Sequence, residues 1–151
     1  MKLHLSKLLC IVCLFSAPTF AKDRLEVYKD YDIGTEITLM TTVKVDPNME
    51  EVYLAGLAQS WVKAVKLQKK LGFIKDWKIL GSDFPLSGDF NLILIVTFEN
   101  SADMEPSKKK YMAFMDAWGK ENNEQSQELS AKYPEVRTLT GEYVLREVII
   151  D

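Results

Sequence analysis

Apolar and polar residues largely alternate from Glu36 to Val45. One side of this segment carries Ile37, Leu39, Thr41, Val43 and Val45, which is typical of a half-buried strand rich in β-branched residues. The strongest strand pattern is the apolar run from Phe90 to Phe98. Two further runs, Phe73 to Leu80 and Thr138 to Ile150, also predict strands.

A first helical pattern follows the first strand. Asn48 is expected to cap this helix, with Glu51 as its capping-box partner. Gly72 is expected to end the helix after Leu71. The apolar residues that recur at helical spacing are Leu54, Leu57, Ala58, Trp61 and Val65.

A second helical region begins near Asp103, Pro106 and Ser107, and Pro134 ends it. Its apolar stripe consists of Tyr111, Phe114, Met115 and Trp118. The polar stretch from Gly119 to Glu128 leaves open whether the helix is continuous.

The order of these elements is β-α-β-β-α-β, the split βαβ pattern of ferredoxin-like α+β domains. It predicts a four-stranded antiparallel sheet with both helices on one face. The charged segment 22–35 is expected to be an N-terminal arm or a short edge element. Residues 36–151 then form a single domain.

The predicted sheet is apolar on both faces. Within the strand from Phe90 to Phe98, one face carries Leu92, Leu94 and Val96, and the other carries Ile93 and Ile95. Helices on one face leave the other uncovered, and a partner sheet is the simplest cover, so we expect a homodimer. The alternative is that the N-terminal arm covers this face or that the strand packs locally.

From Glu36 to Ile150 the chain resembles the dimeric α+β barrel superfamily, which includes the antibiotic-biosynthesis-monooxygenase-like and stress-responsive barrel proteins. The resemblance depends on element order, strand character and length. It implies two ferredoxin-like subunits packed sheet to sheet, each with a ligand pocket between helices and sheet. Members range from cofactor-independent oxygenases and haem degraders to proteins of no known activity.

Residues 1–21 fit a secretory signal peptide. Lys2 and Lys7 precede a short apolar stretch, Leu8 to Phe15, and small residues precede a cleavage site after Ala21. No run reaches the roughly 20 apolar residues that span a bilayer. We expect an exported protein, periplasmic or secreted.

Cleavage would remove His4, Cys10 and Cys13, the only His and Cys residues of the chain. This argues against Cys or His nucleophiles, haem held by His or Cys, and ordinary zinc sites, so we expect no cofactor and no metal. The 19 basic residues become 17 against 22 acidic ones, a formal charge of −5. Nucleic acids are therefore unexpected partners.

Aromatic residues provide the candidate ligand site. The expected lining consists of Tyr53, Trp61, Trp77, Tyr111, Phe114, Trp118 and Tyr143, together with Arg146, which would bind a ligand carboxylate. The alternative interpretation is that the aromatic residues are core and that Arg146 pairs with an acid at a sheet edge. Ser60 and Lys63 have the Ser-x-x-Lys spacing of a serine–lysine acyl enzyme, but a solvated helix face is the better interpretation.

Two classes of function remain. The first is a non-enzymatic module that binds a small apolar or aromatic ligand or a partner protein. The second is a cofactor-independent oxygenase or isomerase, whose pocket would rely on a few Trp, Tyr, Arg or Asp side chains. Turnover distinguishes the two classes, whereas ligand binding alone does not.

Overall fold

The computed structural model describes residues 24–84 and 88–150, and the predicted signal peptide and its cleavage site lie outside these residues. The strands are β1 (Tyr31–Ile33), β2 (Ile37–Val45), β3 (Asp76–Gly81), β4 (Leu92–Phe98), β5 (Arg137–Leu145) and β6 (Val148–Ile150). The helices are α1 (Glu50–Gln59), α2 (Trp61–Lys70), α3 (Lys108–Trp118) and α4 (Lys120–Lys132), with short 3-10 turns η2 (Ser101–Met104) and η3 (Tyr133–Glu135). No helix in the described part of the chain is long and apolar enough to cross a membrane.

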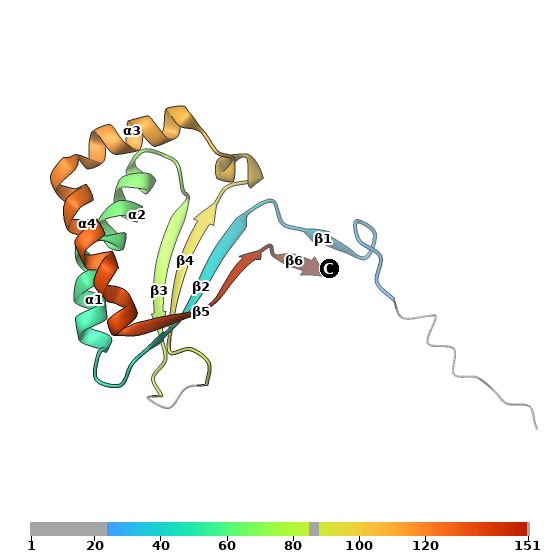
Figure 1. Cartoon of the computed structure of the whole chain (residues 1–151). Helices are drawn as coiled ribbons and strands as arrows, with labels where there is room; N and C mark the ends of the chain where they lie inside the picture. The colour runs from blue at the N-terminus through green and yellow to red at the C-terminus, as the bar shows by residue number, and fades with distance from the viewer. Residues whose placement is uncertain (1–23, 85–87, 151) are drawn as a thin grey trace, which may run out of the picture.

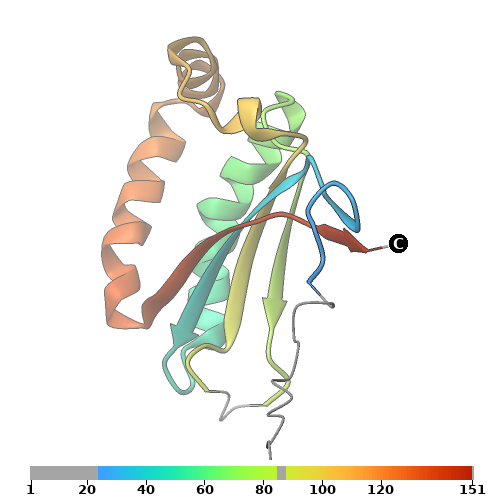
Figure 2. The same ribbon diagram turned by 90° about the vertical axis from the view of Figure 1, so that its right-hand side faces the viewer.

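The four long strands form one antiparallel sheet in the order β3-β4-β2-β5. The crossover α1–α2 connects β2 to β3, and the crossover α3–α4 connects β4 to β5, each time with one strand in between. The helices lie on one face of the sheet (Figure 2). The chain therefore has the ferredoxin-like α+β fold that the pattern predicts.

The core lies between this face and the helices. Val43 of β2 and Leu92 of β4, exposed by 0% and 1%, pack against Tyr53 and Leu57 of α1 and against Tyr133. Full burial of an apolar side chain of this size contributes ~1.5–3 kcal/mol. These few contacts therefore fix where α1 and the end of α4 sit on the sheet.

The first helical segment differs from the prediction in two ways. Asn48 does not cap it: Met49 holds the cap position without a side-chain bond, and Asn48 has a φ of 65°. The left-handed conformation that Asn tolerates serves the turn after β2, where the Met49 N–H donates to the carbonyl of Asp46 (3.1 Å). The helix is also broken at Ser60, with φ −119° and ψ −88°, into α1 and α2. Gly72, with φ 70°, follows the end of α2.

The second helical region is discontinuous. Ser107 caps α3 by accepting a hydrogen bond from the Lys110 N–H (3.2 Å), as its position predicts. Gly119, with φ 76° and ψ 161°, separates α3 from α4. None of the residues of α4 is buried.

The last predicted strand is two strands. β5 stays in the sheet, whereas β6 pairs with β1 from the N-terminal arm, with Asp32 opposite Ile149. We call this two-stranded element the ribbon. The Arg146 guanidinium bonds the carbonyl oxygens of Gly34 (3.3 Å) and Thr35 (3.1 Å) where the ribbon leaves the sheet. The ribbon projects away from the helices (Figure 1).

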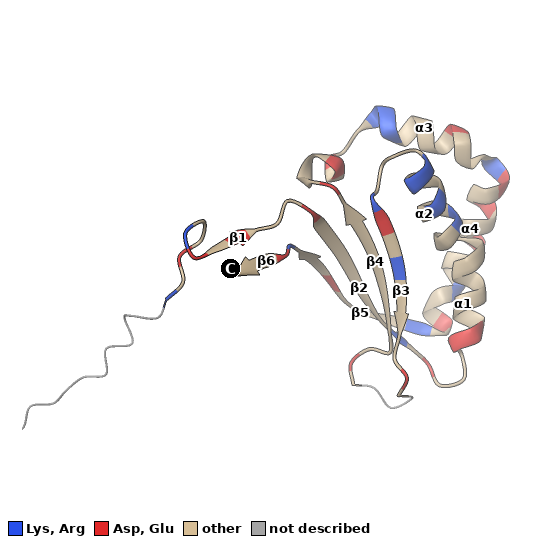
Figure 3. Cartoon of the chain, turned by 180° about the vertical axis from the view of Figure 1, so that it is seen from behind, with Lys and Arg blue, Asp and Glu red and all other residues tan. Residues whose placement is uncertain are grey.

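The second side of the sheet, which we call the outer face, carries no helix. Strand register places on it the apolar residues Leu80, Ile93, Ile95, Met40, Tyr143 and Leu145, with the charged Asp76 and Lys78 of β3 at the edge of the sheet. In the described part of the N-terminal arm, strand β1 pairs with β6 and not with the four-stranded sheet. Charged side chains gather along α2, whereas β4 carries none (Figure 3). The apolar residues of the outer face therefore have no helix or strand packed over them in the described part of the chain.

Replacement of Gly119 by Ala tests the break between α3 and α4. At φ 76° and ψ 161° an L side chain is strained, so we expect Gly119→Ala to lower the free energy of unfolding by about 1–3 kcal/mol. Urea denaturation measures this loss. Gly88→Ala is the control, because Gly88 has no positive φ and a Cβ there meets nothing within 4 Å. Equal stability of the two variants would contradict the strain.

Candidate functional site

A cavity of about 360 Å³ lies between the helices and the sheet, and we call it the helix–sheet cavity. Its apolar lining includes Leu57, Trp61, Ala64, Leu94 and Leu139. Its polar lining includes Thr41, Tyr53, Ser60, Ser126, Ser130, Tyr133 and Arg137. The volume lies near the lower end of the ~300–1,000 Å³ range of small-molecule sites.

A hydrogen-bonded pair of hydroxyl groups lies in the wall of this cavity. The Ser60 Oγ lies 2.5 Å from the Tyr133 hydroxyl and donates to the carbonyl of Gly56 (3.0 Å). Ser60 is 1% exposed. The interpretation of Ser60 as part of a solvated helix face is therefore wrong. The break between α1 and α2 places this serine in the interior.

Tyr133 lies in close contact with helix α1. A Cβ on Gly56 would lie 2.9 Å from its ring, so only glycine lets the ring approach this closely. The ring also packs edge-on against Tyr53, with 5.1 Å between the centroids. The end of the second crossover is thereby joined to the first.

Arg137, the first residue of β5, provides the positive charge of the cavity. Its guanidinium lies 5.9 Å from the ring centre of Tyr53 and 5.5 Å from that of Tyr133. Its Nε is buried and has no hydrogen-bond acceptor among the described residues. No described carboxylate lies within 4.0 Å of the guanidinium. An unsatisfied buried donor of this kind costs about 1–3 kcal/mol, more when charged.

The Tyr53 side chain is only 2% exposed. Burial raises the pKa of its phenol above the ordinary value of 10.0, and the nearby Arg137 opposes this shift in part. Tyr53 is therefore protonated at neutral pH and able to donate a hydrogen bond.

Two of the predicted ligand-binding residues, Tyr53 and Trp61, line the helix–sheet cavity together. A third, Trp77, lies directly behind Trp61 in a T-shaped contact with 5.8 Å between the ring centres. These residues come from α1, α2 and β3. The ligand-binding role of all three stays a prediction.

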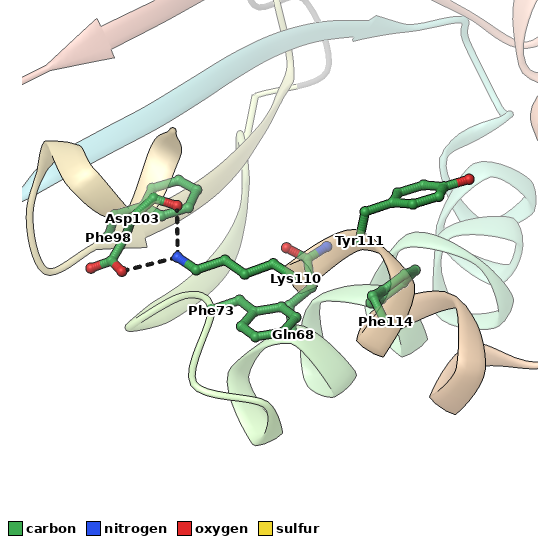
Figure 4. A pocket seen from close by; sticks show the side chains of 7 residues that line it. All are labelled: Gln68, Phe73, Phe98, Asp103, Lys110, Tyr111 and Phe114. Atoms are coloured by element: carbon green, nitrogen blue, oxygen red, sulfur yellow. Dashed lines mark hydrogen bonds and ion pairs between the residues drawn. The ribbon is translucent and has the colours of Figure 1, made fainter. Parts of the chain in front are cut away.

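Three other predicted residues lie on α3. Tyr111 and Phe114 line a separate pocket of about 200 Å³, where the Lys110 ammonium bonds the carboxylate (3.2 Å) and the carbonyl (3.3 Å) of Asp103 (Figure 4). Trp118 stacks on Phe114 with 5.6 Å between the rings. Because its charges pair with each other, this pocket offers a ligand less than the helix–sheet cavity does.

The remaining two predicted residues lie elsewhere. Tyr143 is on the outer face, and Arg146 bonds the backbone at the base of the ribbon. A register shift of β5 beside Thr42 and Val43 explains the position of Tyr143. Without this bulge, Tyr143 would share the face of Arg137 and the cavity.

Neither Arg137 nor Tyr133 was predicted from the sequence as a site residue. Their signal in the sequence was weak. Tyr133 directly precedes Pro134 and Arg137 follows it by three residues, at a helix-to-strand junction where a polar side chain does not by itself indicate a site. In the described residues, no group of three or more His, Cys, Asp or Glu is arranged to hold a metal ion.

No protein-family model and no curated protein matches the sequence. The chain is similar to the crystal structure of a dimeric protein of unknown function and ferredoxin-like fold from Bacteroides fragilis NCTC 9343, with 14% identity over 74% of this chain and 94% of that chain and a TM-score of 0.42. It is also similar to a dimeric ferredoxin-like protein of unknown function from Thermobifida fusca yx, with 11% identity, coverage of 77% and 92%, and a TM-score of 0.32. The narrower resemblance to the dimeric α+β barrel superfamily stays a prediction.

The raised pKa of Tyr53 predicts a pH effect on stability. Above about pH 10 the unfolded chain loses the phenol proton before the folded chain does, so the free energy of unfolding falls as the pH rises. Tyr53→Phe should make this fall less steep between pH 8 and about pH 11. Urea denaturation at both pH values measures it, with Tyr111→Phe, at a 61% exposed position, as the control. An unchanged slope in Tyr53→Phe would count against the shift.

Proposed function

We propose that this protein is a binding protein for a small apolar or aromatic ligand, which it holds in the helix–sheet cavity. One observation carries the proposal: a cavity with apolar walls encloses convergent polar groups, with Tyr53, Tyr133 and Arg137 in its lining. Most small-molecule sites combine these two features.

The lining favours binding over catalysis. Its described residues include hydroxyl groups and one guanidinium but no carboxylate. General-base chemistry needs an acceptor whose pKa lies near the working pH, and a phenol with a raised pKa is far from that. The oxygenase or isomerase alternative therefore has less support from this geometry.

We also propose that the protein, exported as its first residues predict, forms a homodimer through the outer face. Ile93, Ile95 and Met40 give the centre of this face apolar side chains, and Tyr143 and Leu145 extend it, being 47% and 41% exposed. The ribbon projects on the side away from the helices, so in a sheet-to-sheet pair it would reach the partner (Figure 1). Its apolar residues Val148 and Ile150 are exposed by 55% and 63%.

A cavity-filling variant tests the binding site. Ala64 lines the cavity, so Ala64→Leu should lower the affinity for the neutral probe 4-phenylbutyramide at least about tenfold by occupying its space. Isothermal titration calorimetry measures this affinity. Ala117→Leu on α3 is the matched control, because position 117 is exposed and outside the cavity. Wild-type affinity in Ala64→Leu, with its fold intact by circular dichroism, would show that the probe binds elsewhere.

A charge on the outer face tests the dimer. Native mass spectrometry of the mature protein should give two chains, each beginning at Lys22. Ile95→Lys should give single chains at the same concentration, because its ammonium group would be desolvated in the proposed interface, and Lys78, its neighbour on β3, has the same charge. Val52→Lys on α1, at a position 58% exposed on the helical side, should stay dimeric. A monomeric wild-type protein would rule out the dimer.

A further inference from the structure

The geometry points to a ligand with a single carboxylate on a compact apolar or aromatic body, and it assigns Arg137 as the residue that binds this carboxylate. This inference rests on the proposed function, since it concerns the same helix–sheet cavity. It narrows the class of ligand and identifies the group that selects it.

The hydrogen bonding of Arg137 is incomplete. Its Nε is buried without an acceptor among the described residues, although an arginine has five N–H donors in a planar fork. The two neighbouring tyrosine rings provide cation–π contacts, which do not satisfy an N–H in the plane of the guanidinium. A ligand carboxylate would supply the missing acceptor with matching planar geometry.

The positive charge of Arg137 has no acidic partner among the described residues. No described acidic side chain lies within 4.0 Å of the Arg137 guanidinium, and none is among the described residues that line the cavity. The positive charge is thus not neutralised from within the site. A single arginine in the cavity, in a chain with 22 acidic and 19 basic residues, favours a ligand with one negative charge over a polyanion.

The Tyr53 hydroxyl provides a second donor beside Arg137, since both belong to the same lining. The Tyr133 hydroxyl is not counted with it, because Ser60 Oγ donates to the carbonyl of Gly56 and therefore accepts the Tyr133 proton. Burial keeps Tyr53 protonated, so it donates to an anion and does not repel it. A carboxylate has two oxygens and accepts several hydrogen bonds, and this donor set meets that requirement.

The rest of the lining is largely apolar. Leu57, Trp61 and Ala64 line the cavity from the helices, and Leu94 lines it from the sheet. These side chains would contact the apolar part of a ligand, and the cavity volume of about 360 Å³ admits only a small ligand. An amphipathic lining of this kind fits an amphipathic ligand.

A matched pair of probes tests the assignment. The carboxylate 4-phenylbutyrate and the neutral 4-phenylbutyramide differ at the head group and share the same apolar body. We expect wild-type protein to bind the carboxylate at least about tenfold more tightly in isothermal titration calorimetry. Arg137→Met should remove this preference while changing the affinity for the amide by less than about threefold.

Two further variants keep the test decisive. Arg146→Met is the matched control on the same stretch of chain, because Arg146 bonds backbone at the ribbon, and it should retain the full preference. Arg137→Lys keeps the charge and the long stem, so it should fold where Arg137→Met does not, and it should retain only part of the preference because it lacks the planar fork.

The outcomes separate this inference from the proposed function. If the amide binds, Ala64→Leu blocks it and the carboxylate binds no more tightly, the inference is overturned and the binding function stands. If the preference survives in both Arg137 variants, Arg137 does not carry it and the assignment is overturned. If neither probe binds wild-type protein, the proposed function is contradicted, and the inference falls with it.

Discussion

The side chain of Tyr133 joins the two helical crossovers, and the candidate site depends on this contact. Its hydroxyl bonds Ser60 at the break between α1 and α2, and its ring lies against Gly56 and Tyr53. Helix α4 has no buried residue, and its other contacts include the partly buried Leu129 against the core and the hydrogen bonds of Gln125 with Gln59 and Lys63. Tyr133 therefore fixes the end of α4 relative to α1, and both helices line the cavity. Arg137, the first residue of β5, follows directly after the short turn η3 and Val136.

The two faces of the sheet have different roles. One face carries the helices, the core and the cavity. The outer face has apolar residues without a cover in the described part of the chain, and the ribbon extends away from the helices on that side (Figures 1 and 2). The proposed binding and the proposed association would therefore use separate surfaces of the sheet.

Local patterns were sufficient to predict β2 and β4, because alternation in β2 and the apolar run of β4 depend on nearest neighbours along the chain. They did not show that the last predicted strand divides into β5 and β6, because β6 pairs with β1 from the N-terminal arm. They were not sufficient for the break at Ser60: apolar positions continue at helical spacing from Leu57 to Val65, and the partner of Ser60 lies 73 residues away. The same limit applies to the site. Tyr53 and Trp61 could be predicted because both face the core from helices, whereas Arg137 acquires its role only through the register of β5 beside Val45.

The contact between Gly56 and Tyr133 also constrains how this sequence can change over time. Any side chain at position 56 would meet the tyrosine ring at 2.9 Å, so a larger residue there is compatible only with a smaller one at position 133. A smaller residue at 133 removes a hydroxyl from Ser60 and a ring from Arg137. Substitutions at these two positions are therefore expected to occur together in divergent copies of this protein, and such a joint replacement would change the cavity lining beside Arg137.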